Sequence, residues 1–93
     1  MNSSKNTNPA YEIWVESACQ RDLKRLQEKD FSRIVDAIKY LSENPRPQGV
    51  RKISGSENDW RFRVGVFRVI YEIDDEARVI RILRVRHRKE VYR

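Results

Sequence analysis

Residues 59–85 read DWRFRVGVFRVIYEIDDEARVIRILRV, and apolar and basic side chains alternate along much of this segment. Because successive side chains of a strand point to opposite faces, the alternation predicts one apolar face and one face that carries arginines. Gly65 and the acidic run at 74–76 interrupt the alternation with residues that suit tight turns. We therefore predict three strands, at about Asp59–Val64, Val66–Asp74 and Ala77–Val85.

The middle strand divides its two faces most clearly. Every second residue from Phe67 to Ile73 is apolar or aromatic, so we expect this face to meet the rest of the core. Arg68 then projects from the opposite face of the sheet. The last strand has apolar residues on both faces, which leaves the orientation of Arg81 open.

The N-terminal half predicts the layer that covers the apolar face. Residues 11–15 alternate as a short strand, and the Ser17 and Gln20 spacing of a capping box predicts a helix that ends near residues 28–30. Asp30 suits the cap of a second helix, which Pro45 stops. The short connection predicts an antiparallel helical hairpin.

These elements predict one α+β domain over residues 11–93, with the order β-α-α-β-β-β. A helical hairpin packed on a small antiparallel sheet buries both apolar surfaces. Residues 1–10 are polar and rich in Asn and Ser, so we expect a disordered tail there.

Charge is concentrated in the C-terminal half. The 93-residue chain has a formal net charge of +6, and residues 51–93 hold 12 basic and 7 acidic side chains. This excess favours a polyanion or an acidic protein as the partner.

Composition argues against several other classes. One His and one Cys provide neither a soft-ligand metal site nor an internal disulfide, so we expect no metal and no cofactor. We find no apolar segment that suits a membrane span and no signal peptide pattern, and we expect a cytoplasmic protein that does not bind membranes.

Basic residues gather at places that a sheet could bring together. They are Arg51 and Lys52, then Arg68, then Arg86, His87, Arg88 and Lys89, followed by Tyr92. RNA cleavage without a metal needs a base, an acid and cations for the charge on phosphorus. Lys52 is a candidate base, while His87 or Tyr92 could move a proton and Tyr92 could instead stack on a nucleobase. Taken singly, each residue is more typical of a solvated or salt-bridged side chain, so the combination carries the hypothesis.

Four segments together resemble the RelE/ParE superfamily of bacterial type II toxins across residues 11–93. They read YEIWVESACQRDLKRL, RKISG, RFRVGVFRVIYEID and VRHRKEVYR. The resemblance implies a small antiparallel sheet on a helical hairpin, as expected above, and a cognate small acidic antitoxin. It also implies one of two activities. The RelE branch cleaves messenger RNA in the ribosomal A site without a metal, and the ParE branch poisons DNA gyrase.

The resemblance also implies roles for individual residues. It assigns catalysis to Lys52, Arg68, Arg88 and Tyr92, and we expect the neighbouring basic residues Arg51, Arg61, Arg63, Arg86, His87 and Lys89 to contact RNA. Ser54 stands where the RelE pattern has a second basic residue, which leaves the identity of the base open. The retained set predicts a ribosome-dependent endoribonuclease that inhibits translation, with a ParE-like gyrase inhibitor as the alternative.

Overall fold

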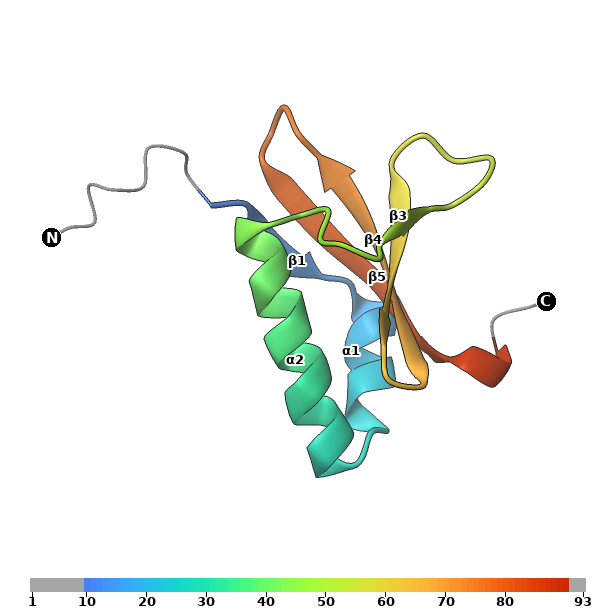
Figure 1. Ribbon diagram of the computed structural model, residues 1–93. Helices are drawn as coiled ribbons and strands as arrows, with labels where there is room; N and C mark the ends of the chain where they lie inside the picture. Colours follow the sequence, from blue (N-terminus) through green and yellow to red (C-terminus); the bar gives the residue numbers. More distant parts are fainter. Residues whose placement is uncertain (1–9, 91–93) are drawn as a thin grey trace, which may run out of the picture.

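The computed structural model describes residues 10–90, which form a five-stranded sheet with two helices beside one of its faces (Figure 1). In chain order the elements are β1 (Glu12–Val15), α1 (Ser17–Lys24), α2 (Glu28–Glu43), β2 (Arg51–Lys52), β3 (Asp59–Val64), β4 (Phe67–Asp74), β5 (Val79–His87) and the 3-10 helix η2 (Arg88–Glu90). The predicted order of elements is confirmed, and β2 is an addition to it. Within residues 10–90, no helix combines the length and apolar character that a membrane crossing requires.

The sheet has the strand order β1-β5-β4-β3-β2. All neighbouring pairs are antiparallel except β1 and β5, which run parallel. The sheet is therefore mixed rather than wholly antiparallel, because the two helices carry the chain from one edge of the sheet to the other. The first and last strands consequently lie side by side.

Both helices have ends that differ from the predicted ones. Helix α1 stops at Lys24, where 3-10-type bonds from the N–H groups of Arg25 and Leu26 close its last turn. Ser17 is its first helical residue and not its cap, and the amide nitrogen Nε2 of Gln20 donates to the Val15 carbonyl at 3.0 Å.

Helix α2 begins earlier than predicted. Gln27 occupies the cap position in place of Asp30, and no side chain caps the helix there. Glu28 and Asp30 lie in the first turn, where their negative charges interact favourably with the positive end of the helix dipole. The end of α2 before Pro45 is confirmed.

The core lies between the helices and the predicted apolar face of the sheet. Its buried members are Cys19, Ile34, Ile38 and Leu41 from the helices, Val69, Tyr71 and Ile73 from β4, and Ile80, Ile82 and Val85 from β5. Burial raises the pKa of the Cys19 thiol to about 11, so this thiol stays protonated at neutral pH.

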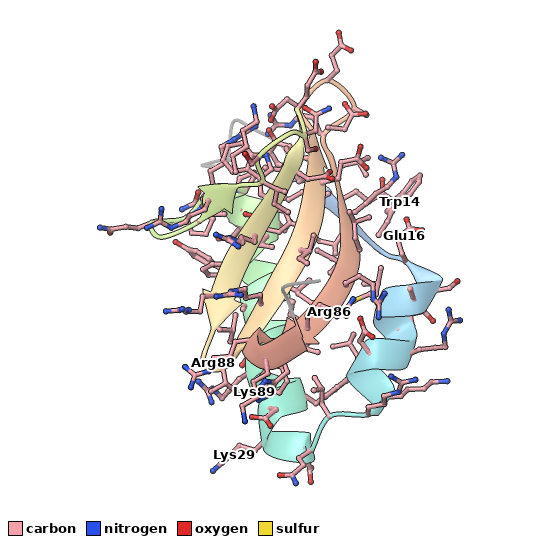
Figure 2. All side chains as sticks on the ribbon, turned by 90° about the vertical axis from the view of Figure 1, so that its right-hand side faces the viewer. Trp14, Glu16, Lys29, Arg86, Arg88 and Lys89 are labelled. Atoms are coloured by element: carbon pink, nitrogen blue, oxygen red, sulfur yellow. The ribbon has the colours of Figure 1, made fainter. Side chains whose placement is uncertain are left out.

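A carboxylate in α1 completes the edge of β5. Pairing between β1 and β5 ends at Val15 and Ile82, and α1 then takes the place of β1 beside the sheet (Figure 2). There Asp22, only 8 % exposed, accepts hydrogen bonds from the Val85 N–H at 2.9 Å and from Nε of Arg84 at 2.7 Å. The backbone donor that β1 leaves unpaired is thereby satisfied.

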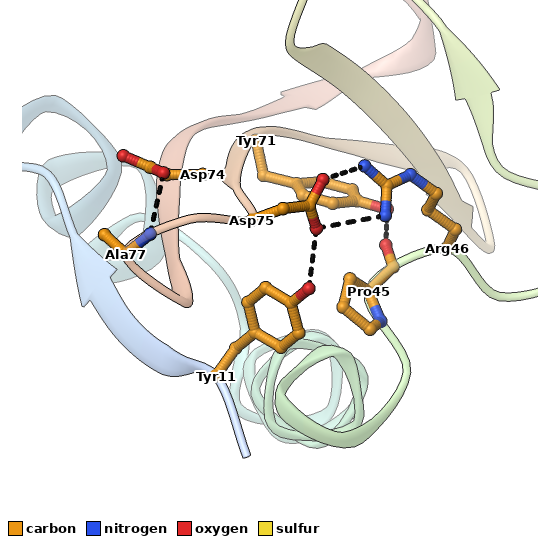
Figure 3. Close-up of polar contacts among 7 residues, drawn as sticks. All are labelled: Tyr11, Pro45, Arg46, Tyr71, Asp74, Asp75 and Ala77. Atoms are coloured by element: carbon orange, nitrogen blue, oxygen red, sulfur yellow. Dashed lines mark hydrogen bonds and ion pairs between the residues drawn. The ribbon is translucent and has the colours of Figure 1, made fainter. Parts of the chain in front are cut away.

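A polar corner holds the loop between α2 and β2 (Figure 3). The buried Tyr71 hydroxyl donates to the Pro45 carbonyl at 2.7 Å. Asp75, in the turn after β4, accepts from the Tyr11 hydroxyl at 2.6 Å and from Nη2 of Arg46 at 2.8 Å. Hydrogen bonds from Arg46 and Tyr11 hold the pKa of the Asp75 carboxyl below its usual value. These contacts fix the loop that leads into β2.

The turn between β3 and β4 requires glycine, as predicted. Gly65 has a φ of 62°, and an added Cβ would lie 2.9 Å from Nη2 of Arg33 in α2. A side chain here would therefore be strained and would also displace Arg33.

Asp22→Asn tests the contact at the edge of β5. We expect it to lower the free energy of unfolding by about 2 kcal/mol, because the charged hydrogen bonds to Arg84 and Val85 are weakened. A larger loss is not expected, since the Arg84 side chain is 39 % exposed and can regain water. Urea unfolding measures the change. Asp36→Asn, at an exposed position of α2, is the matched control and should change stability by less than about 0.5 kcal/mol. Equal effects of the two variants would contradict the role of Asp22.

The same contact predicts a dependence on pH. Burial favours the neutral form of Asp22, but hydrogen bonds from Arg84 and Val85 and the nearby arginine charges outweigh it and lower the pKa. A lowered pKa gives stability that is fully present above the unfolded value of about 3.9 and is lost as pH falls through the folded value. The stability difference between the parental chain and Asp22→Asn should therefore be constant near neutrality and shrink below about pH 4. Unfolding curves at several pH values measure this, and a difference that grows in acid would contradict it.

Candidate functional site

Arginines gather on the face of the sheet that is turned away from α2, here called the open face (Figure 2). One row crosses three strands, because Arg68 of β4 is paired with Arg63 of β3 on one side and with Arg86 of β5 on the other. The next row joins Arg51 of β2 to Arg61 of β3. Strand alternation puts these five guanidinium groups on one face.

A concavity of about 390 Å³ lies among these arginines, here called the arginine groove. Its lining consists of Gln48, Gly49, Arg51, Arg61, Phe62, Arg63 and Arg68. Guanidinium groups stay charged in proteins and present paired N–H donors that match the oxygens of a phosphate. The groove is therefore suited to bind a phosphodiester and to stabilise negative charge that develops on it.

Lys52 does not join Arg68 in this groove. Its partner across the strands is Trp60, whose own partner is the buried Tyr71, so Lys52 lies on the helix side of the sheet. Its Nζ is 5.9 Å from the centroid of the Trp60 ring, and Cζ of Arg46 is 5.0 Å from the same ring. Arg51 is the residue of β2 that faces the groove.

The predicted site residues at the end of β5 and beyond it lie in several places. Arg86 belongs to the arginine row, whereas His87 pairs with Phe67 on the helix side and makes an edge-on ring contact at 5.5 Å. Arg88 and Lys89 are exposed in η2, beyond the end of the sheet strands (Figure 2). Tyr92 lies outside the described residues.

Of the three predicted catalytic residues that lie within residues 10–90, Arg68 alone lines the groove. The predicted RNA contacts Arg51, Arg61, Arg63 and Arg86 share its face, while His87 and Lys89 do not lie in the two rows. The orientation of Arg81, which the sequence left open, is towards the open face. Arg81 pairs there with Glu72, and its Nη1 lies 3.4 Å from Oε1 of that residue. Among residues 10–90 we find no group of three or more His, Cys, Asp or Glu side chains that could hold a metal ion.

Comparisons with known proteins agree with this architecture. A family model described as the ParE toxin of the type II toxin-antitoxin system parDE matches residues 13–92. Toxin RelG of Mycobacterium tuberculosis is 33 % identical over 87 residues, covering 89 % of this chain and 97 % of that protein. The putative toxin RelE1 of Methanocaldococcus jannaschii is 27 % identical over 86 residues, covering 89 % and 96 %.

A solved structure gives the same result for the fold. A chain of the archaeal RelE-RelB complex from Pyrococcus horikoshii superposes with a TM-score of 0.78 and 25 % sequence identity, covering 88 % of this chain and 99 % of that one. With the family model spanning nearly all of the sheet and both helices, this chain belongs to the RelE/ParE superfamily of type II toxin-antitoxin toxins.

Proposed function

We propose that this chain is a ribosome-dependent endoribonuclease that cleaves messenger RNA in the ribosomal A site without a metal ion and so inhibits translation in the cytoplasm. The observation that supports the proposal best is the arginine groove, in which cations from three strands converge on one concavity. Relatives that carry RelE and RelG names support the same branch of the superfamily.

The proposed reaction is an attack within the RNA strand. The 2′-hydroxyl loses its proton to a base and its oxygen forms a bond to the neighbouring phosphorus, while the bond from phosphorus to the 5′ oxygen breaks and that oxygen takes up a proton from an acid. Arg68, between Arg63 and Arg86, stabilises the charge on the pentacoordinate phosphate. Arginines hold their protons too firmly to act as the base, so the groove contributes electrostatic stabilisation rather than proton transfer.

Further residues complete the proposed site. In this proposal Arg88 is a second phosphate contact from η2, and Tyr92 stacks on the substrate or protonates the leaving oxygen. Lys52 faces the other side of the sheet, so we place it at the margin of the site, as a contact to RNA or to the ribosome. Proton abstraction then falls to a group of the ribosome.

The proposed physiological partner is a cognate small acidic antitoxin. Structurally similar toxins are found in complexes with RelB, including the pair from Pyrococcus horikoshii. An acidic chain complements the open face, where the two arginine rows leave a large positive charge.

The second candidate function is ParE-like inhibition of DNA gyrase without cleavage of nucleic acid. The family model that matches this chain is that of the ParE toxin, which favours this alternative. The fold is common to both activities, so only measurements of activity separate them.

The two candidates predict different products. On translating ribosomes we expect the chain to generate new messenger 5′ ends at A-site codons and to leave gyrase supercoiling unchanged. Replacing the A-site 2′-hydroxyl by hydrogen should abolish cleavage, because the attacking group is gone. Intact messages together with blocked supercoiling would establish the alternative. Normal cleavage of the deoxy substrate would instead require an activated water molecule as the nucleophile.

Substitutions test whether the site lies on the open face. Arg68→Ala should reduce ribosomal cleavage by roughly 10² to 10³, the cost of removing one donor to a transition-state oxyanion. Lys52→Ala should reduce it by less than about 10-fold, since a peripheral charge supplies mainly affinity. Rates of messenger cleavage under single-turnover conditions measure both, with the exposed α1 residue changed in Arg21→Ala as the control. A loss in Lys52→Ala that equals the loss in Arg68→Ala would move the catalytic centre to β2.

A further inference from the structure

Trp14 is a large aromatic residue on the same face as the arginine groove. Its neighbours Ile13 and Val15 pack against the core, so strand alternation puts Trp14 on the open face, where it is 45 % exposed. Figure 2, which views this face, shows Trp14 beside β5 near the start of α1. None of the roles assigned above uses it.

The indole of Trp14 is held by the strand beside it. Arg81 is its partner on β5, and Cζ of Arg81 lies 5.2 Å from the centroid of the ring. Nη1 of Arg81 is in turn 3.4 Å from Oε1 of Glu72. A guanidinium group thus lies over the indole and is itself fixed by a carboxylate, which orients the ring before any ligand arrives.

Charge changes sharply between this row and the next ones. Trp14 and Arg81 share their row with two carboxylates, Glu72 and Asp59. The adjacent row runs from Arg51 and Arg61 through the half-buried Ile70 to Arg84 of β5, and the row beyond it holds Arg63, Arg68 and Arg86. Phosphates are attracted to the arginine rows and repelled by the carboxylates, whereas an uncharged nucleobase is tolerated beside Trp14.

The spacing suits one continuous strand of RNA. Trp14 and Arg68 are separated by two strand intervals and by four residues along β4, which corresponds to roughly 16 Å. A few nucleotides of extended single strand span that distance. A strand whose phosphates lie in the groove therefore brings a nearby base to the indole.

We propose that Trp14 is a stacking platform for a nucleobase of the messenger strand, outside the arginine groove. The inference rests on the proposed nuclease function and deepens it, because it extends the binding surface from phosphates to a base. Stacking on an aromatic side chain accepts any of the four bases. The platform thus adds affinity without adding codon preference.

A short 2′-O-methyl RNA, which lacks the attacking hydroxyl, tests the proposal without cleavage. In a Trp60→Phe background Trp14 is the sole indole, and we expect RNA to quench its fluorescence. Trp14→Ala should weaken binding by about 5- to 100-fold, and Trp14→Phe should recover much of that loss. Tyr40→Ala, which removes a 51 % exposed aromatic from α2, is the matched control and should bind like the parental chain.

The salt dependence separates stacking from phosphate contact. Trp14→Ala should leave the slope of log affinity against log salt unchanged, whereas Arg68→Ala should reduce its magnitude by about one. Thermal melting of each variant verifies that the fold is retained. Unquenched Trp14 fluorescence, equal RNA affinity of Trp14→Ala and the parental chain, or no RNA binding at all would overturn the proposal. The proposal would also be overturned if Trp14→Ala bound the antitoxin more weakly than the parental chain but bound RNA equally well, since Trp14 would then be a contact to protein.

The assays also separate this inference from the nuclease proposal. Binding to uncleavable RNA needs no catalysis, so quenching without messenger cleavage would overturn the nuclease function and support the platform. Messenger cleavage with unchanged RNA affinity in Trp14→Ala would overturn the platform and leave the nuclease proposal supported.

Discussion

The buried carboxylate of Asp22 is the interaction on which the arrangement of this small domain depends. It accepts from the backbone of Val85 and from Arg84, where β1 no longer covers the edge of β5. One side chain thereby fixes α1, completes the sheet and sets the position of the second half of β5. Arg86 follows Val85 directly and belongs to the arginine row. The hydrogen bond between Asp22 and Val85 therefore also helps to position Arg86 on the open face.

The alternation of strand side chains links stability to the site. In β4, Arg68 lies between Phe67 and Val69, which pack in or against the core. Its backbone is therefore held by buried neighbours on both sides, which fixes the point on the sheet from which the guanidinium group extends. A core substitution beneath the groove would disturb the arginine rows as well as stability.

Sequence patterns predicted the regions where one period dominates. The two long strands around Gly65 and the core face of β4 follow from alternation. The predicted helix caps and the predicted end of α1 were wrong, because neither helix has a side-chain cap and backbone hydrogen bonds close the last turn of α1. Strand β2 has two residues, which is too short for an alternating pattern to be recognised in the sequence. The face on which Lys52 lies could therefore not be predicted, because it depends on the pairing of Lys52 with Trp60. Arg81 was ambiguous because of the β-bulge where β5 meets Ile70 and Tyr71. Asp22 and Arg84 are 62 residues apart, and no local pattern joins them.

All the charged residues that line the groove are arginines, which has a consequence for how the cell can control this protein. A surface built on histidine or carboxylates changes its charge with local pH, and a lysine surface can be acetylated. Guanidinium groups keep their charge under all cellular conditions, so this surface has no acid-base off-switch. A binding partner must then occupy the surface of each molecule to neutralise it. Every copy without a bound partner keeps its affinity for polyanions.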